Sequence, residues 1–264
     1  MSVSRTAVMT AALRAAETAR PDRLFDDPLA SAFVAAVRAA GEPVVQLPPG
    51  ASEFAAIRTR FFDDAALAAC AGGVRQVVLL AAGFDSRAFR LAWPNGVRLF
   101  ELDLPATFAL KEPVLDGVAA RCTRTVVPVD LRGDWSGALD TAGYAVARPT
   151  AWLAEGLLPY LAGAECDRLL ATVTGSSAPG SRFVFDQLGG TDRPAIRATA
   201  DAIRATAGAQ LVPTVDDPVR WLAGHAWRAT VSRVTALGEH YGRPLPEYVD
   251  RAASDAVALV SATR

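Results

Sequence analysis

The sequence predicts an α/β protein with a mostly parallel β-sheet, helices on both of its faces, an antiparallel last strand and an N-terminal helical cap. Short apolar runs occur between Gln76 and Phe185, and continuous runs of this length are typical of strands buried on both faces. Helical patterns separate these runs, and such alternation is typical of βαβ units. The 264 residues, 51% of them apolar, suit a single domain spanning residues 1–264.

Residues 1–72 are predicted to form the cap, and residues 73–264 the sheet-containing core. Alanines alternate with charged residues up to Arg20, a pattern typical of an amphipathic helix, which Pro21 ends. A second long helical pattern, Ser52–Ala71, ends at a pair of glycines.

Two shorter signals lie between these helices. Asp27 and Pro28 predict a helix start, with Asp27 as the N-cap and Pro28 at the first helical position. Residues 41–50 are rich in proline and glycine and are predicted to form a loop.

The core is predicted to alternate strands and helices. The predicted strands are Gln76–Ala82, Val97–Leu99, Thr125–Val129, Ala151–Ala154 and Arg182–Phe185. The helical patterns between and after them are Ala106–Ala119, Gly163–Thr174 and Ala195–Ala207. Trp227–Val234 and Ala256–Ala262 come last, with only a short irregular stretch between them, and are predicted to pair antiparallel at the end of the sheet.

Composition argues against several kinds of partner. The net charge is −1 and no basic cluster flanks an apolar helix, so we expect neither a nucleic-acid nor a membrane partner. Cys70, Cys122 and Cys166 are widely separated and odd in number, which fits neither a disulfide framework nor a zinc site. With only two histidines, a histidine-based metal site is not expected. We expect a reduced, cytoplasmic protein.

Acidic residues follow four of the predicted strands. Asp85, Asp103, Asp130 and Glu155 come after the first, second, third and fourth strands. Ligands of parallel sheets bind outside the carboxyl ends of the strands, where an acid after the second strand can accept hydrogen bonds from ribose hydroxyls. This arrangement predicts a site for an adenosine-containing ligand. The alternative is that each acid caps a helix or lies on the surface.

Several segments resemble the motifs of the leucine carboxyl methyltransferase family, including its bacterial branch of S-adenosylmethionine-dependent methyltransferases. The four main motifs are VVLLAAGFDSRAFRL (77–91), FELDLPATFALK (100–111), VPVDLRGDW (127–135) and WLAEGLLPYL (152–161). Others are AETARPDRLFDDPLA (16–30), AIRTRFFDD (56–64), PGSRFVFD (179–186) and HYGRP (240–244). The resemblance implies a Rossmann-like class I methyltransferase fold, S-adenosyl-L-methionine as cofactor and a small-molecule substrate.

The resemblance also implies roles for residues at both ends of the cofactor. Arg58 matches the arginine that binds the cofactor's carboxylate, as suits a guanidinium fork. Gly83 matches the last glycine of the cofactor loop, and Glu155 an acid near the methionine end. Asp103 matches the ribose-binding acid. Glu101 is the alternative, because residues two apart in a strand face the same way.

The resemblance places Asp130 and Leu131 beside the adenine. At the first loop the chain departs from the family, because Ala81 stands where the family usually has glycine. We expect Ala81 to keep extended geometry with φ below zero, since it continues the apolar run. If the position instead requires a positive φ, alanine costs on the order of 1 kcal/mol, and cofactor binding could be weakened or lost.

Other residues are weaker candidates. Tyr160 follows the fourth motif, and His225 lies in the aromatic segment WLAGHAW (221–227); either could contact substrate or simply pack in the protein. Asp85 and Arg87 are expected to close the first loop by capping the next helix, with a direct cofactor contact as the alternative.

The leading hypothesis is methyl transfer to an oxygen of a small molecule, in bacterial secondary metabolism. A carboxylate acceptor needs no base and a phenol benefits from one, so the scarcity of histidine favours a carboxylate. A dinucleotide-dependent oxidoreductase would need G-x-G-x-x-G after the first strand, where only Gly83 is present. The other alternative is a cofactor-binding scaffold that has lost or repurposed methyl transfer.

We expect residues 1 to about 50 to cover the substrate side of the pocket as a lid.

Overall fold

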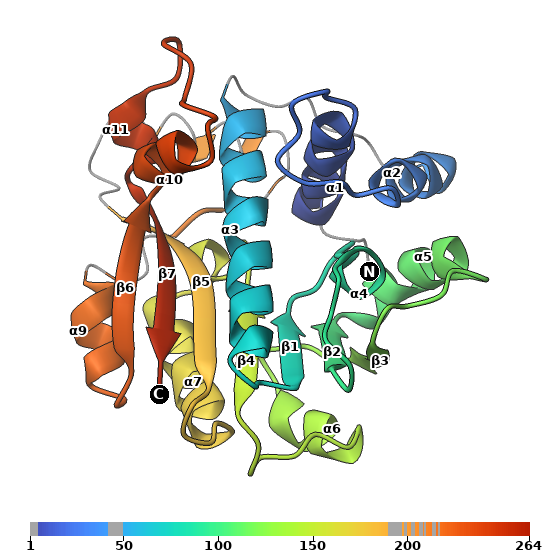
Figure 1. Ribbon diagram of the computed structural model, residues 1–264, viewed down its shortest axis with the longest axis vertical. Helices are drawn as coiled ribbons and strands as arrows, with labels where there is room; N and C mark the ends of the chain where they lie inside the picture. The colour runs from blue at the N-terminus through green and yellow to red at the C-terminus, as the bar shows by residue number, and fades with distance from the viewer. Residues whose placement is uncertain are drawn as a thin grey trace.

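The computed structural model contains a seven-stranded sheet in the order β3-β2-β1-β4-β5-β7-β6 (Figure 1). The residues described are 5–41, 50–189, 217–264 and, between the last two ranges, 197, 200, 201, 204, 205, 208, 210–212 and 215. The strands are β1 (Gln76–Leu80), β2 (Arg98–Asp103), β3 (Thr123–Pro128), β4 (Thr150–Ala154), β5 (Arg182–Leu188), β6 (Arg228–Arg233) and β7 (Val257–Thr263).

The first five strands run parallel, and β7 pairs antiparallel with both β5 and β6. This confirms the mostly parallel sheet and the antiparallel pair at its end. Every residue of β1 and β4 is buried, which explains why the central strands are apolar without alternation.

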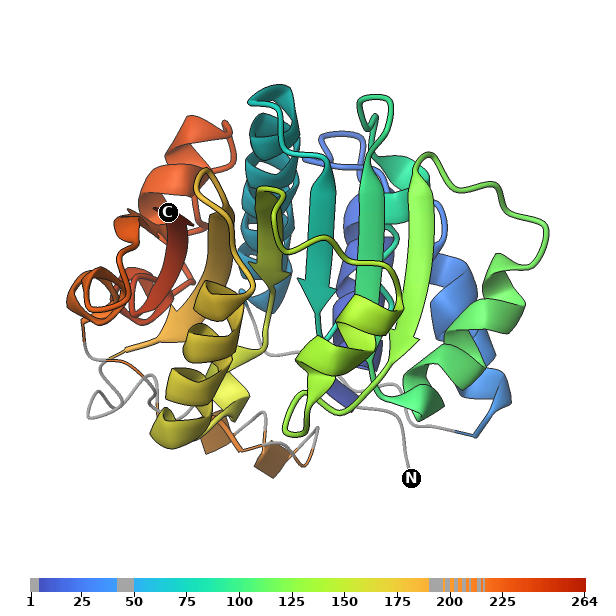
Figure 2. The same ribbon diagram turned by 90° about the horizontal axis from the view of Figure 1, so that it is seen from below.

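Helices cover both faces of the sheet. They are α1 (Arg5–Thr18), α2 (Ala30–Ala39), α3 (Ala51–Ala71), α4 (Arg87–Arg90), α5 (Pro105–Leu115), α6 (Trp135–Thr141), η1 (Leu158–Tyr160), α7 (Gly163–Gly175), α9 (Pro218–Ala223), α10 (Val234–His240) and α11 (Arg251–Ser254). Figure 2 shows α3 and α7 on opposite sides of the sheet. No helix in the described ranges is long and apolar enough to cross a membrane.

Alternate residues of the strands face two separate cores. Val78 and Trp152 pack with α6, α7 and α9, while Val77 and Leu153 pack with α3. The period-two alternation of strand side chains therefore divides the apolar residues between the two faces.

The structure corrects several expected boundaries. The second strand begins at Arg98 and runs on to Asp103, and the first strand ends at Leu80 rather than Ala82. Helix α6, Trp135–Thr141, was not expected; its N-cap Asp134 accepts a hydrogen bond from Gly137 N. Most of the predicted loop at 41–50 and of the predicted helix Ala195–Ala207 lies outside the described residues.

Asp27 is not the N-cap of α2. The helix begins at Ala30 with Leu29 as its N-cap residue, although the Asp27 carboxylate accepts a hydrogen bond from Leu29 N at 3.3 Å. Asp27 is buried and forms an ion pair with Arg14 of α1, 3.1 Å between Oδ2 and Nε. This long-range pair ties the first two cap helices together.

Candidate functional site

A cavity of about 860 Å³ lies at the carboxyl ends of the parallel strands, within the range of roughly 300–1,000 Å³ usual for ligand pockets. Parallel sheets bind ligands at this edge. Residues from α1 and α3 also line the cavity, so the N-terminal helices form one of its walls. The strand-end residues that line it are Ala81–Asp85, Asp103–Leu104, Val129–Arg132, Glu155–Leu157 and Asp186.

The loop after β1 is held by Asp103 at the end of β2. Gly83 has a φ of 51°, and its backbone N–H donates to Asp103 Oδ2 at 2.6 Å. The other oxygen, Oδ1, accepts from Leu104 N at 2.6 Å and Thr107 Oγ1 at 2.8 Å. A Cβ on Gly83 would lie 3.3 Å from Ala7 Cβ, so glycine allows both the left-handed turn and the close approach of α1.

Ala81 has a φ of 57°, so the expectation of an ordinary negative φ is wrong. The chain turns immediately after Leu80, one residue earlier than the apolar run suggested, and Ala82 N still donates to Leu102 O at 3.0 Å. Ala81 lines the cavity and packs against the core on the α7 side of the sheet. An alanine in the left-handed region costs on the order of 1–2 kcal/mol, which glycine would avoid.

Arg58 of α3 lies between two carboxylates, the buried Asp186 and the partly buried Glu155. Its Nε donates to Glu155 Oε1 at 3.1 Å, and its Nη1 donates to Asp186 Oδ2 at 3.3 Å. Burial opposes the charge of Arg58, but Asp186 and Glu155 outweigh it and raise the pKa of the guanidinium. Its Nη2 group makes no hydrogen bond to the described residues and remains available at the cavity wall.

Glu155 connects Arg58 to a second buried arginine. Arg87, fully buried after the first loop, donates to Glu155 Oε2 at 2.7 Å and to Asp63 at 2.7 Å, and also pairs with Asp85. Burial raises the pKa of Glu155, but Arg87 and Arg58 outweigh it and lower the pKa overall. Both oxygens of Glu155 are engaged, so its first role is to hold Arg58 in place.

Asp130 lies at the opposite end of the cavity. Its carboxylate binds Arg132, with 2.6 Å between Oδ2 and Nη2, and this hydrogen bond lowers the pKa of Asp130. Both side chains are largely exposed, so a ligand could displace Arg132 at little cost. Leu131 and Val129 provide apolar contacts beside Asp130.

Sequence comparison identifies the family. Residues 7–174 match the family described as leucine carboxyl methyltransferase. The chain belongs to the leucine carboxyl methyltransferase family. It is 45% identical to "Putative S-adenosyl-L-methionine-dependent methyltransferase" of Parafrankia sp. (strain EAN1pec), covering 92% of this chain and 83% of the relative. A protein of the same description from Streptomyces coelicolor is also 45% identical, over 93% of this chain and 91% of the relative.

Solved structures share the fold of this member of the leucine carboxyl methyltransferase family. A crystal structure described as a putative methyltransferase from Thermobifida fusca has a TM-score of 0.62 at 19% identity, covering 90% of this chain and 89% of that one. A DUF574 family protein from Streptomyces avermitilis has a TM-score of 0.63 at 13% identity, with 96% of both chains covered. The fold is that of class I methyltransferases. The family match and the similarity to these relatives show that the chain is an S-adenosylmethionine-dependent methyltransferase.

The cavity fits the family's cofactor, S-adenosyl-L-methionine. The Arg58 Nη2 group offers donors for a carboxylate, and Asp103 retains lone-pair capacity beyond its three internal hydrogen bonds. The positive φ of Gly83 brings backbone to the cavity surface between them. Leu104 and Leu131 supply apolar walls suited to a purine.

Glu101 does not line the cavity, so it cannot contact a cofactor bound there. Its side chain is fully buried, 2.6 Å from Lys111 Nζ and 2.8 Å from Arg124 Nη2. Alternation along β2 puts Glu101 and Asp103 on one face, but only Asp103 reaches the end of the strand. Glu101 is instead the counter-ion of the chain's single lysine.

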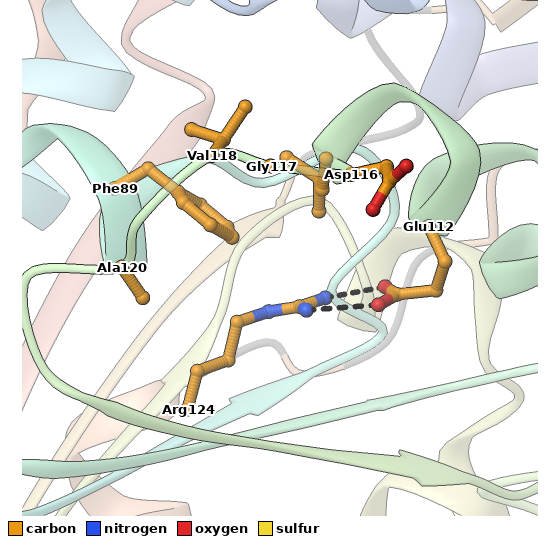
Figure 3. A pocket seen from close by; sticks show the side chains of 8 residues that line it. Phe89, Glu112, Asp116, Gly117, Val118, Ala120 and Arg124 are labelled. Atoms are coloured by element: carbon orange, nitrogen blue, oxygen red, sulfur yellow. Dashed lines mark hydrogen bonds and ion pairs between the residues drawn. The ribbon is translucent and has the colours of Figure 1, made fainter.

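Arg124 also borders a smaller surface pocket of about 370 Å³ beside α5 (Figure 3). Its guanidinium points toward Glu112, with 2.7 Å between Nη2 and Oε1, and lies over the Phe89 ring. Because Glu101 and Glu112 balance Arg124 and Lys111, this pocket presents no uncompensated cation to a ligand.

Of the two weaker candidates, the structure brings only Tyr160 to the cavity. Burial raises the pKa of the Tyr160 hydroxyl to about 12, with Arg58 lowering and Asp186 raising it. His225 follows α9 and does not line the cavity, and its backbone N–H donates to Leu222 O. The neighbouring Trp227 donates to Thr174 of α7 at 2.9 Å, so this aromatic segment packs against α7.

Sequence reasoning missed Asp186 and the full role of Arg87. Asp186 follows the apolar residues FVF (183–185), as the other acids follow apolar runs, although β5 continues beyond it to Leu188. The network around Arg87 had no local signal, because its partners Asp63 and Glu155 lie 24 and 68 positions away.

Proposed function

We propose that this methyltransferase transfers the methyl group to an oxygen of a small molecule, in the cytoplasm and in bacterial secondary metabolism. The observation that carries this proposal is a single cavity that joins the candidate cofactor contacts at the ends of β1 to β4 to an apolar region beyond them. A cavity of about 860 Å³ suits a small-molecule acceptor. Both acceptor classes inferred from the sequence, a carboxylate and a phenol, fall within this proposal.

In this proposal, each part of the cofactor meets a separate group of residues. Arg58 binds the carboxylate, Asp103 the ribose hydroxyls, and Asp130 and Leu131 the adenine. Glu155 orients Arg58 through the hydrogen bond to Nε. When bound, S-adenosyl-L-methionine supplies an electrophilic methyl group on a sulfonium. The protein's contribution is to position the acceptor oxygen and to exclude water.

The decisive experiment separates the two ends of the cofactor. Calorimetry would compare S-adenosylhomocysteine with 5′-methylthioadenosine, which lacks the amino-acid portion. Arg58→Ala should weaken binding of S-adenosylhomocysteine by roughly 2–4 kcal/mol and leave binding of 5′-methylthioadenosine nearly unchanged, because only S-adenosylhomocysteine carries the carboxylate. Arg60→Ala is the matched control, since Arg60 lies two positions along α3, pairs with Asp64 and does not line the cavity. Equal losses for both ligands would overturn the assignment of Arg58.

The second candidate is a cofactor-binding scaffold without methyl transfer. The positive φ of Ala81 favours it, because the family's usual glycine suits that conformation better. Transfer of label from methyl-labelled S-adenosylmethionine to any acceptor in a library of phenols and carboxylic acids would contradict this alternative. Tight cofactor binding without any labelled product would support it.

A further inference from the structure

The cavity has two halves of different chemistry. The ends of β1, β2 and β3 carry the proposed ribose and adenine contacts. The second half, which we call the acceptor half, is formed by the ends of β4, β5 and β7, by parts of α3 and by the segment before α11. Its lining is mainly apolar and includes Phe54, Leu157, Tyr160, Leu188, Val249 and Val257.

The described part of the cavity offers no cation to an anionic acceptor. Arginines are the only cationic side chains in this lining, and each is already paired: Arg14 with Asp27, Arg58 with Glu155 and Asp186, Arg87 with Asp63, Asp85 and Glu155, and Arg132 with Asp130. Of these, Arg58 reaches the acceptor half, and its remaining donors are those proposed for the cofactor's carboxylate.

Asp186 gives the acceptor half a negative charge. Its side chain is 2% exposed; Oδ1 accepts from Gly156 N at 2.5 Å and Oδ2 from Arg58 at 3.3 Å. Burial raises the pKa of Asp186 more than Arg58 and Gly156 lower it, and nearby Glu155 adds to the rise. The pKa of Glu155 shifts the other way. The electrostatic balance at Asp186 therefore disfavours a second negative charge.

Among the described residues, each Asp186 oxygen accepts one side-chain or backbone hydrogen bond, from Gly156 N or from Arg58, so each can accept another. The Tyr160 hydroxyl lines the same cavity and lies close enough to Asp186 for that carboxylate to contribute to the rise in the Tyr160 pKa, after burial. This hydroxyl makes no hydrogen bond to the described residues. An acceptor hydroxyl could donate to Asp186 and accept from Tyr160. A carboxylate has no proton to donate, and a cationic amine would meet the sulfonium of the bound cofactor.

We propose that the methyl acceptor is an uncharged, largely apolar molecule presenting a hydroxyl group, and that Asp186 selects it by accepting a hydrogen bond from the hydroxyl and repelling carboxylates. This rests on the proposed transfer to oxygen and narrows its two acceptor classes to the hydroxyl class. It reverses the preference for a carboxylate that the scarcity of histidine suggested, because a buried carboxylate replaces histidine as the polar partner of the acceptor.

Three probes on one ring system test the proposal: 2-naphthol, 2-naphthoate and 2-(aminomethyl)naphthalene. Their affinities are measured by calorimetry on the protein saturated with sinefungin, a non-reactive analogue in which a carbon bearing an ammonium group replaces the sulfonium and its methyl group. We expect 2-naphthol to bind at least tenfold more tightly than either charged probe. Binding of 2-naphthoate as tight as 2-naphthol, tighter binding of the amine, or no binding of any probe would each overturn the proposal.

Asp186→Asn then tests the selecting residue. Asparagine keeps a carbonyl oxygen for Gly156 N but removes the charge, so the preference for 2-naphthol over 2-naphthoate should fall to about threefold or less. Asp64→Asn removes the same charge from a carboxylate of α3 that pairs with Arg60 and does not line the cavity, so it should leave that preference unchanged. An Asp186→Asn variant with the wild-type preference would show that Asp186 only holds Arg58.

The test separates this proposal from the proposed function. Sinefungin and S-adenosylhomocysteine affinities of the wild-type protein are measured first. If neither ligand binds, the cofactor assignment itself fails. If both bind and 2-naphthol is not preferred, the cofactor site stands and only the hydroxyl-selecting role of the acceptor half is overturned.

Discussion

Ala81 carries the clearest local strain in the site. Its φ of 57° lies in the left-handed region, where alanine costs roughly 1–2 kcal/mol and glycine none. Glycine also gives the unfolded chain more freedom, which offsets about 0.4–1 kcal/mol. Ala81→Gly should therefore raise the free energy of unfolding by roughly 0–1.6 kcal/mol, measured by urea denaturation. A loss of stability would show that the methyl group's packing outweighs the backbone strain.

The same variant tests whether Ala81 obstructs the cofactor. Because Ala81 also packs against the core on the α7 side, we expect its methyl to be accommodated there and cofactor affinity to change by less than tenfold. A gain of tenfold or more, about 1.4 kcal/mol, would favour the scaffold alternative. Gly83→Ala is the control with the opposite expected effect. It would place a Cβ 3.3 Å from Ala7 Cβ at a positive φ and should weaken cofactor binding.

Asp103 and Glu101 form a matched pair for assigning the ribose contact. Asp103→Asn should weaken S-adenosylhomocysteine by roughly 1–3 kcal/mol. Glu101→Gln should leave that affinity unchanged but lower the free energy of unfolding by roughly 3–5 kcal/mol, because it leaves Lys111 buried without a carboxylate. Calorimetry and urea denaturation of both variants check the two effects. The assignment would be reversed if Glu101→Gln weakened binding of S-adenosylhomocysteine and Asp103→Asn did not.

At the residue scale, the sequence located the acids at strand ends but not how each is used. Asp103, Asp130 and Glu155 line the cavity, since an acid directly after an apolar run is a local signal. Glu101 was not distinguishable from Asp103, because the alternation of side chains does not show where a strand ends. The φ of Ala81 depends on where the chain leaves the sheet, which the apolar run placed too late.

Among the elements, α1 has the most direct connection to function. Thr6, Met9 and Leu13 line the cavity, and Arg14 Nη2 donates to Phe84 O in the loop after β1 at 2.6 Å. Removal of residues 1–24 should keep the sheet but abolish turnover and speed release of S-adenosylhomocysteine at least tenfold, because lids of this kind exclude water and retain ligands.

Stopped-flow release measurements and circular dichroism check the truncation. Arg5→Ala, at an exposed position of α1, is the control and should release S-adenosylhomocysteine at the wild-type rate. Wild-type turnover and release in the truncated protein would contradict the lid role.

Most elements followed from periodicity because they satisfy one rule over many residues. The long helix α3, Ala51–Ala71, begins one residue before the predicted start at Ser52 and ends at the predicted residue. The short helix α6 was not predicted, because its seven residues are too few to show a helical periodicity of apolar residues, although Asp134 is a typical N-cap. Asp27 was misread because its ion pair with Arg14 links segments 13 residues apart.

At the scale of the whole molecule, one buried network joins three parts of the chain. Arg87 connects the loop after β1 to α3 through Asp63 and to the end of β4 through Glu155. No sequence pattern predicts such a network, because its members are brought together only by the sheet order. The stability of the fold and the placement of Arg58 therefore depend on the same ion pairs.

This network should make stability depend on pH through Asp85. Burial raises the pKa of Asp85, but Arg87, Arg14 and other cations outweigh it and lower the pKa from 3.8 to about 2. A carboxyl with a depressed folded-state pKa contributes stability above its unfolded pKa and loses it as the pH falls through the folded value. The contribution, about 2 kcal/mol, should be fully present at neutral pH and decline between about pH 4 and pH 2.

Comparison of wild type with Asp85→Asn isolates this contribution from that of other carboxyls. At neutral pH the variant should unfold at a lower urea concentration, because Arg87 loses one of its carboxylates. The difference in free energy of unfolding should stay constant down to about pH 5 and shrink by roughly half at about pH 3, where the wild-type carboxyl begins to take up its proton. A difference that grows toward low pH would have the opposite sign and would mean that folding raises the pKa of Asp85.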